Sequence, residues 1–435
     1  MNQLAIRRAL IIVQSTAIGG MERNSAEVVA ELARRGTAVM AVVPPDPEFD
    51  PVAAAMRSSS VEVVRVLTDA RDGRIAQLLG LARLARSARA FSPDVVHLNV
   101  GGATGGLAPV LMARLATRAV VVVTEHDVPP AGLSPWQRLK RGLMDRTLHA
   151  LVAISRLNAK GRFKNLGAPT AKFAVVLNGV NLPILTPRES AANRASVRSQ
   201  LGLSADETVI GSVVRLVPNK GLTTLLQAVA LVTAQHEARL LLVGGGPMEA
   251  ELRDLALDLG IQDRVLMVGH QADASRYVDA MDMFVLPVPV GSGSIALIEA
   301  MARGRAPVIT FGDGEEAVIH ERTGLWSPSE NHEALAAAML RLCADRALRE
   351  RLGAEAARHV SRHYSIRRNT DDLVDIYLGA RRGSIPSGLS ATDPKDPRPG
   401  DRCLNSLRAS GAGHGRQQRF DDEVLLVLGE TNIER

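Results

Sequence analysis

The sequence predicts an α/β fold made of two doubly wound domains, each a parallel sheet with helices on both faces. Short runs rich in β-branched residues alternate with helical patterns along most of the chain. The alternation is interrupted once and then restarts, which indicates a second domain. At about 150 residues per domain, the length of 435 residues also suggests two or three domains, and 46% hydrophobic residues suffice for their cores.

The predicted strands are bounded by turn-forming or polar residues. The first domain is expected to have strands at 10–13, 39–43, 61–66, 95–98, 120–124, 151–154 and 173–177. The second is expected to have strands at 209–214, 240–243, 265–268, 284–286 and 308–310. Helical patterns between successive strands favour parallel pairing, because parallel strands need a long crossover connection.

Prolines, glycines and charge set the predicted domain borders. Residues 1–182 form the first domain, and 183–203 form a linker in which prolines interrupt the pattern before a polar helix. The second domain spans 204–362, and a last helix lies within 363–382. Residues 383–435 are rich in Pro, Gly, Ser and Asp, so we expect a disordered tail there.

Composition excludes several classes of protein. The net charge of +6 and the few aromatic residues (Phe 7, Tyr 3, Trp 2) disfavour a nucleic-acid binder. Two cysteines cannot form a disulfide framework or a four-cysteine metal site, which favours a cytoplasmic protein. The first apolar run is interpreted as a strand rather than a signal peptide, and no run approaches the roughly 20 apolar residues of a membrane span.

Glycines follow two of the predicted strands and open helices. Gly19 and Gly20 let a ligand approach the backbone, although a tight turn explains two glycines equally well. Gly244, Gly245 and Gly246 follow the strand at 240–243. They lack the Gly-x-Gly-x-x-Gly spacing of dinucleotide-binding proteins, which disfavours a nicotinamide dehydrogenase.

Charged and polar side chains follow two strands of the second domain. Arg215 and Lys220 flank a strand-to-helix loop, where they suit a diphosphate; the alternative is that both are solvated surface charges. Ser294 is a good helix cap, and Glu299 lies one turn inside the apolar helix that follows. A carboxylate there needs a partner such as a ribose diol, unless it is simply exposed.

Taken together, these motifs resemble the retaining nucleotide-sugar glycosyltransferases of family 4. That family has the GT-B fold, in which two Rossmann-like doubly wound domains face a central cleft. The resemblance extends to about residue 380. It rests on 19–23, 94–97, 124–127, 176–180, Arg215 with Lys220, 243–247, 299–302, and Glu316 with 323–325.

The resemblance implies a role for each matching residue. Arg215, Lys220, Gly19 and Gly20 would bind the donor diphosphate, while Glu299, Gly293, Ser294 and Gly245 would bind the donor nucleotide and sugar. His126 would contact the transferred hexose, so His126 and Glu299 are the candidate catalytic residues. The last helix would return to the first domain. No metal or cofactor is expected, and the nucleoside diphosphate sugar is a substrate.

One position departs from the family pattern. The family has two glutamates eight positions apart, and the position that pairs with Glu299 is Gly291. Three interpretations stay open: a different donor sugar, another residue in that role, or loss of transfer activity. The last makes the chain a catalytically silent GT-B protein that binds nucleotide sugar or partners. An isomerase or a phosphorylase on the same kind of fold has no clear signature here.

The acceptor side of the sequence carries a basic segment. Residues 135–166 contain eight cations and one acidic residue, Asp145, interleaved with apolar residues on a helical pattern. Such a segment suits anionic lipid at the inner face of the cell membrane, and a lipid-linked or saccharide acceptor; it can also be simply solvated.

Overall fold

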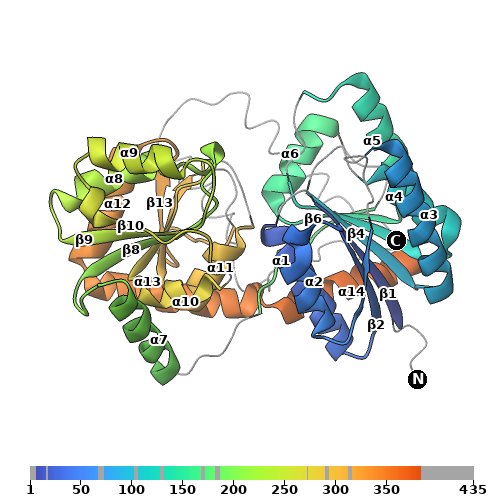
Figure 1. Ribbon diagram of the computed structural model, residues 1–435, viewed down its shortest axis with the longest axis horizontal. Coiled ribbons are helices and arrows are strands. Elements are labelled where there is room, and N and C mark those ends of the chain that lie inside the picture. The colour runs from blue at the N-terminus through green and yellow to red at the C-terminus, as the bar shows by residue number, and fades with distance from the viewer. Residues whose placement is uncertain are drawn as a thin grey trace, which may run out of the picture. The chain divides into compact units, whose positions relative to one another are not determined.

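The computed structural model describes most of the chain in two units (Figure 1). The described residues are 6–15, 18–66, 73–101, 106–127, 132–167, 172–181, 187–271, 273–289, 293–311 and 316–383. The first unit consists of two segments of the chain, one that ends at Asn181 and one that begins at Ile366. The second unit runs from Leu182 to Ser365. Gly291, the beginning of the predicted linker and the predicted tail from residue 384 lie outside the described residues.

The first unit is a seven-stranded parallel sheet of order β3-β2-β1-β4-β5-β6-β7. Its strands are β1 (Arg8–Gln14), β2 (Ala38–Val43), β3 (Glu62–Arg65), β4 (Val95–Val100), β5 (Val120–Glu125), β6 (Ala150–Ala153) and β7 (Lys172–Val175). Its helices are α1 (Gly20–Arg34), α2 (Asp50–Arg57), α3 (Arg74–Phe91), α4 (Leu107–Ala116), α5 (Pro135–Thr147), α6 (Arg156–Leu166) and α14 (Ile366–Arg382), with a 3₁₀ turn η1 (Pro47–Phe49).

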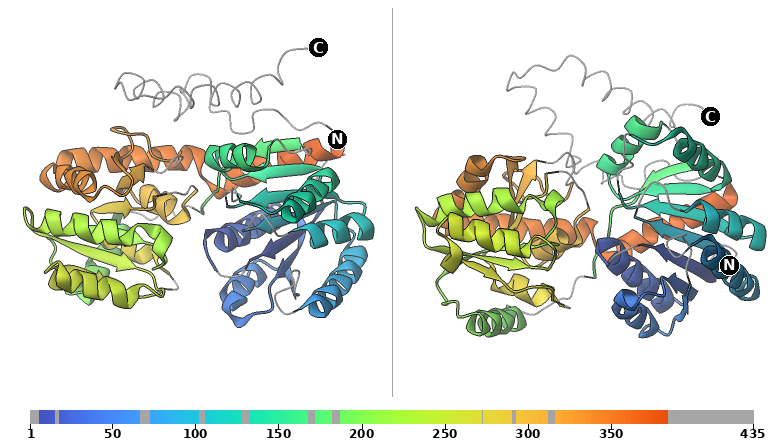
Figure 2. Two further views of the ribbon diagram at one scale, coloured as in Figure 1. Left: turned by 90° about the horizontal axis from the view of Figure 1, so that it is seen from above. Right: turned by 45° about the horizontal axis from the view of Figure 1, so that its top comes forward.

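Two apolar cores fix which helices cover which face of this sheet. Side chains of α1, α2 and α14 pack with alternate strand residues such as Ile11 and Val122. Side chains of α3, α4 and α5 pack with the intervening residues, such as Ile12 and Val123. Because successive side chains of a strand point to opposite faces, the strands of this sheet are apolar on both sides. Figure 2 shows the helices in these two layers.

Helix α14 joins the first unit although it lies near the end of the described chain. The N–H of Ile366 donates to the carbonyl of Val180, and Leu373, Ile376 and Tyr377 are buried in the same core as α1. The chain therefore leaves the first unit once, forms the second, and comes back.

The second unit is a six-stranded sheet of order β10-β9-β8-β11-β12-β13, all parallel. Its strands are β8 (Thr208–Val213), β9 (Ala238–Val243), β10 (Val265–Met267), β11 (Met283–Leu286), β12 (Ala306–Phe311) and β13 (Leu325–Pro328). Its helices are α7 (Pro187–Gln200), α8 (Leu222–Thr233), α9 (Glu249–Asp258), α10 (Ser275–Ala280), α11 (Ile295–Ala302), α12 (His332–Ala344) and α13 (Arg346–His363), with 3₁₀ turns η2 (Pro218–Lys220) and η3 (Gln262–Arg264).

Ion pairs attach helix α7 to the second unit. Arg194 and Arg198 both reach the carboxylate of Asp282, at 2.6 and 2.7 Å. The Nη1 atom of Arg303 lies 2.9 Å from the fully buried carboxylate of Asp279, to which Asn193 also donates. A buried carboxylate needs such partners, so these contacts specify where α7 docks.

Both sheets confirm the predicted fold class: two parallel, doubly wound domains. Every predicted strand is present, and β13 is an additional one at the edge of the second sheet.

Candidate functional site

Most of the candidate residues follow strands near the point where the strand order of each sheet reverses. In the first sheet β1 lies next to β4, and in the second β8 lies next to β11. The connections on the two sides of such a point run in opposite directions, which leaves a crevice at the carboxyl ends of the strands. In the first unit, Gly19 and Gly20 follow β1, and His126 follows β5. In the second, Arg215 and Lys220 follow β8, and Gly293 and Ser294 follow β11.

Asn99 holds the ring of His126. The Nε2 atom of His126 lies 3.1 Å from the amide oxygen of Asn99, on the neighbouring strand β4. An amide oxygen only accepts hydrogen bonds, so the proton of the neutral ring is on Nε2 and Nδ1 is an acceptor. Burial, with a smaller contribution from His97, lowers the pKa of His126 to about 3. The ring therefore presents a neutral acceptor over the ordinary pH range.

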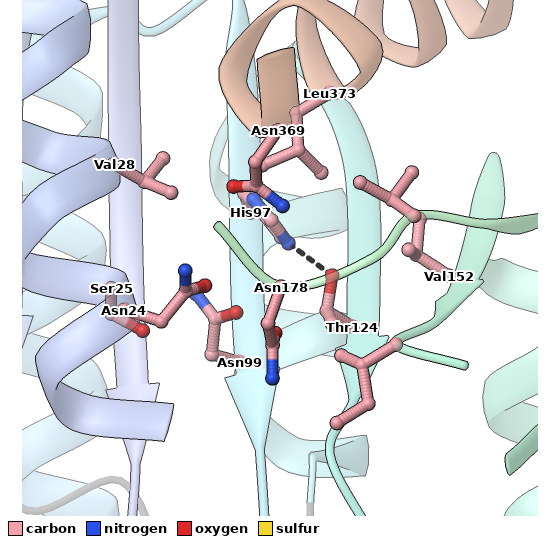
Figure 3. Close-up of a pocket in the computed structure, with 12 residues that line it drawn as sticks. Asn24, Ser25, Val28, His97, Asn99, Thr124, Val152, Asn178, Asn369 and Leu373 are labelled. Carbon is pink, nitrogen blue, oxygen red and sulfur yellow. Dashed lines mark hydrogen bonds between the residues drawn. The ribbon is translucent and has the colours of Figure 1, made fainter. Parts of the chain in front are cut away.

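A second histidine lies deeper in the first unit. His97 is buried; its Nε2 lies 2.7 Å from the hydroxyl of Thr124 (Figure 3), and its Nδ1 lies 2.6 Å from the hydroxyl of Tyr377 on α14. Burial lowers the pKa of His97 to about 3, so the ring is neutral. These bonds fasten α14 to the centre of the sheet.

We expect Tyr377→Phe to lower the free energy of unfolding by about 1–2 kcal/mol, because the change leaves a buried histidine nitrogen without its partner. Urea denaturation measures the loss. Tyr277→Phe in the second unit is the matched control, since its hydroxyl donates to Gln271 at 3.0 Å in a less buried setting. A loss no larger than in the control would show that the bond to His97 does not fasten α14.

A small cavity with several polar groups adjoins His97, and Asn99, the partner of His126, is part of its lining. Its lining includes His97, Asn99, Thr124, Asn24 and Asn178 (Figure 3). Ser25 and Asn369 also line it, and each has a buried oxygen without a hydrogen-bond partner. A cavity with several polar groups suits an ordered water molecule, which would satisfy these oxygens.

The glycines at the start of α1 differ in what their N–H groups contact. The N–H of Gly19 donates to the buried carboxylate of Glu22 at 2.6 Å. The N–H of Gly20, the first residue of α1, has no acceptor among the described residues. At the start of this helix, the N–H of Gly20, and not that of Gly19, is therefore available to donate to a ligand.

Arg215 is the most available cation at the second switch point. Its guanidinium is exposed and makes no hydrogen bond or ion pair with any described residue. Lys220 is half-buried at the end of η2, directly before Gly221, which caps α8. Gly221 has a φ of +67°, and a Cβ added there would lie 1.9 Å from the carbonyl oxygen of Pro287. The loops after β8 and β11 are therefore in contact beside Arg215 and Lys220.

The three glycines after β9 have two different functions. Added Cβ atoms at Gly244 and Gly246 would lie 2.0 and 2.4 Å from backbone oxygens of the loop after β8, so packing alone requires these two glycines. Gly245 has room for a Cβ, and its carbonyl accepts the N–H of Leu216. No described group accepts the N–H of Gly245. Of the three, Gly245 is the one that can donate to a ligand.

Helix α11 begins at the cap residue Ser294, whose hydroxyl accepts the N–H of Leu297 at 3.3 Å. Gly293 before it has a φ of +67°, and Glu299 is half-buried in the helix. Gly293 and Glu299 both make further contacts. In the described ranges no three His, Cys, Asp or Glu side chains gather as metal ligands.

The basic segment 135–166 is not a uniform solvated surface. Arg141 and Arg162 are buried; Arg141 pairs with Glu125 at the end of β5, and Arg162 pairs with Asp145. Burial and the neighbouring Arg162 lower the pKa of Arg141 to about 9. This cluster joins α5 and α6 to β5, the strand directly before His126. Those two arginines therefore cannot contact a membrane, and only the other cations of the segment can.

Comparison with known proteins agrees with this architecture. A family model of glycosyl transferases group 1 matches residues 193–359, and a model of Glycosyltransferase Family 4 matches residues 18–183. An uncharacterized glycosyltransferase of Methanocaldococcus jannaschii is 28% identical over 48% of this chain and 54% of its own length. The GDP-mannose-dependent monoacylated alpha-(1-6)-phosphatidylinositol monomannoside mannosyltransferase of Corynebacterium glutamicum is 27% identical over 60% of this chain and 71% of its own.

Solved structures share the fold. HepE of Anabaena, crystallised with UDP, superposes with a TM-score of 0.70 at 20% identity, over 84% of this chain and 98% of its own. The glycosyltransferase of Rickettsia africae superposes with a TM-score of 0.73 at 18% identity, over 87% of this chain and 100% of its own.

Proposed function

Because the chain belongs to the family 4 glycosyltransferases, we propose that it moves a hexose from a nucleoside diphosphate sugar to a saccharide or lipid-linked acceptor. The donor is of the UDP or GDP type, and the anomeric configuration is retained. The product is a polysaccharide or a glycoconjugate. The corynebacterial relative, named for GDP-mannose and a phosphatidylinositol mannoside, and the Anabaena structure with UDP support this range of donors and acceptors.

The observation that carries the proposal is the guanidinium of Arg215 at the β8/β11 switch point, which pairs with no residue in the described part of the chain. In the proposed donor complex, Arg215 and Lys220 neutralise the diphosphate and so stabilise it as a leaving group. The N–H of Gly245 and the start of α11 at Gly293 and Ser294 donate to the nucleotide or the sugar.

Three further residues complete the proposed site. Glu299 accepts hydrogen bonds from the ribose hydroxyls. From the first unit, Nδ1 of His126 would accept a hydrogen bond from the transferred hexose, and the N–H of Gly20 would donate to the phosphates. The two cations and the helix start supply the positive charge that a divalent ion supplies elsewhere, so we propose transfer without a metal or cofactor.

The test is a thermal unfolding panel with UDP, GDP, ADP and NAD. A ligand at 100 times its dissociation constant stabilises a protein by roughly 2.7 kcal/mol, so binding is easily detected. We expect UDP or GDP to raise Tm. Arg215→Ala should lower the affinity for that nucleotide by about 10- to 100-fold, because a charge-assisted hydrogen bond is lost. Arg253→Ala is the matched control: Arg253 is an exposed arginine of the same unit, paired with Glu249.

The outcomes separate the competing functions. If no nucleoside diphosphate raises Tm, or if only NAD does, the donor-site proposal is wrong. If UDP or GDP binds through Arg215 but no acceptor receives sugar from the matching donor, the catalytically silent alternative replaces the transferase.

A further inference from the structure

The exposed apolar side chains of this protein are concentrated on one layer of helices. Nine large apolar side chains are exposed among the described residues, and the two on the second unit, Leu231 and Leu257, lie on separate helices. The other seven all lie on α3, α4 and α5: Ile75, Leu78, Leu79, Leu115, Trp136, Leu139 and Leu143. Scattered apolar residues need no explanation, but a gathering of this kind marks an interaction surface.

These helices are neighbours in one layer. Helix α3 packs on α4, α4 packs on α5, and all three cover the same face of the first sheet (Figures 1 and 2). On α3, Leu84 and Ala88 face the sheet, while Ile75, Leu78 and Leu79 recur at the helical spacing of an outward face. We call this layer's outer side the α3–α5 face.

The charge of the α3–α5 face is uniformly positive. Its exposed cations are Arg74, Arg83, Arg86, Arg89, Arg114, Arg138, Lys140 and Arg146. The three helices contain a single carboxylate, Asp145, which is buried and paired with Arg162. A solvated helix normally mixes both signs, with i,i+4 pairs. Here neither α3 nor α4 contains an acidic residue.

We propose that the α3–α5 face docks on an anionic lipid bilayer. Exposed leucines, an isoleucine and a tryptophan beside arginines and a lysine form the surface of a helix that lies in a membrane interface. Lys140 lies 5.2 Å from the ring centre of Trp136, so a cation and an aromatic ring share one place on α5. The complete absence of exposed acid on these helices complements negative headgroups. In the described chain no helix is long and apolar enough to cross a bilayer, so this contact is peripheral.

This surface differs from the one predicted from 135–166. It gains α3 and the exposed Leu115 of α4, and it leaves out the buried Arg141 and the whole of α6, whose Arg162 is also buried. It also lies across the sheet from the polar cavity, which α1 and α14 line. Docking does not rest on the proposed transferase reaction, although it would bring the protein to a lipid-linked acceptor.

The experiment measures sedimentation of the full chain with vesicles of phosphatidylcholine, with and without phosphatidylglycerol. We expect binding only to the anionic vesicles, weakening with added salt. Leu78→Gln with Leu79→Gln should lower the partition coefficient at least about 10-fold, through lost apolar burial. Arg83→Gln with Arg86→Gln should lower it about 30-fold on the anionic vesicles, since each cation near such a surface contributes about 5-fold.

Matched controls lie on the second unit. Leu231→Gln with Leu257→Gln removes two exposed leucines, and Arg253→Gln with Arg346→Gln removes two exposed cations. Neither pair should change vesicle binding. UDP and GDP binding should be the same in all variants, so a failure here is distinguishable from a failure of the donor site.

Three results would overturn the proposal. The full chain does not bind anionic vesicles at all, or the α3 variants bind them as well as the controls do. Alternatively, light scattering shows a dimer that Leu78→Gln with Leu79→Gln dissociates, in which case a second copy of the chain, and not a bilayer, covers the face.

Discussion

Arg162→Met is expected to lower the free energy of unfolding of the first unit by about 3–5 kcal/mol, because it leaves a buried carboxylate without its partner. Arg162 is 1% exposed and pairs with Asp145, which is 6% exposed. Glu125 and Arg141 belong to the same buried cluster, so its two cations and two anions balance. Hydrogen exchange at increasing urea concentration, followed on peptides from each unit, measures the free energy of unfolding of the two units separately.

Restoring the charge balance should restore stability. The double variant Arg162→Met with Asp145→Leu leaves the Arg141–Glu125 pair and buries two apolar side chains, so we expect most of the loss to be recovered. Arg253→Met is the control for an exposed pair and should cost under about 1 kcal/mol. If the double variant is as unstable as Arg162→Met, the cluster does not act through charge balance.

The fold could be predicted because parallel strands buried on both faces have a strong sequence signal. Strand β5 (Val120–Glu125), for example, begins with four consecutive valines, and all six of its residues are buried. Strand β13 was missed because Leu325–Pro328 is short, mixed in composition and ends in proline. It lies at the edge of the sheet and pairs only with β12, so little apolar sequence is needed to hold it.

Burial of charged residues was the least predictable feature. A basic segment is normally a solvated surface, and nothing local in 135–166 shows that Arg141 and Arg162 point inward. Their partners come from β5 and α5. Of these pairs, sequence spacing predicts only the one between Arg141 and Asp145, which are four residues apart on one helix. Conversely, Ile75, Leu78 and Leu79 are large apolar residues that the structure exposes.

The candidate site was predictable strand by strand but not contact by contact. Residues that follow parallel strands gather at one edge of a sheet, so Arg215 could be singled out, whereas His126 was named only through the resemblance to the family. Asn99 was missed, because a polar residue inside a valine-rich strand gives no sign of its partner. The alternation of β4 is the signal that could have found it: His97 and Asn99 share one face, and Asn99 pairs in register with Thr124.

His126→Ala is expected to lower kcat/KM for sugar transfer by about 100-fold, the usual effect of removing one positioned hydrogen-bonding group from a reacting centre. In the proposed site, Nδ1 of His126 accepts from the transferred hexose, and Asn99 keeps the proton on Nε2. The reaction is followed as release of the donor nucleotide with acceptor present. Nucleotide binding should match that of the parent protein, because the nucleotide does not contact the imidazole in the proposed site.

The variant Asn99→Asp tests the same arrangement through pH. The pKa of His126 is lowered to about 3, so the parent's kcat/KM should show no histidine-dependent fall between pH 8 and pH 5. A carboxylate beside Nε2 favours the imidazolium and raises that pKa. Below the raised pKa, Nδ1 carries a proton and cannot accept a hydrogen bond. The variant's kcat/KM should therefore fall as the pH falls within this range, whereas an equally flat profile would show that Nδ1 is not the acceptor.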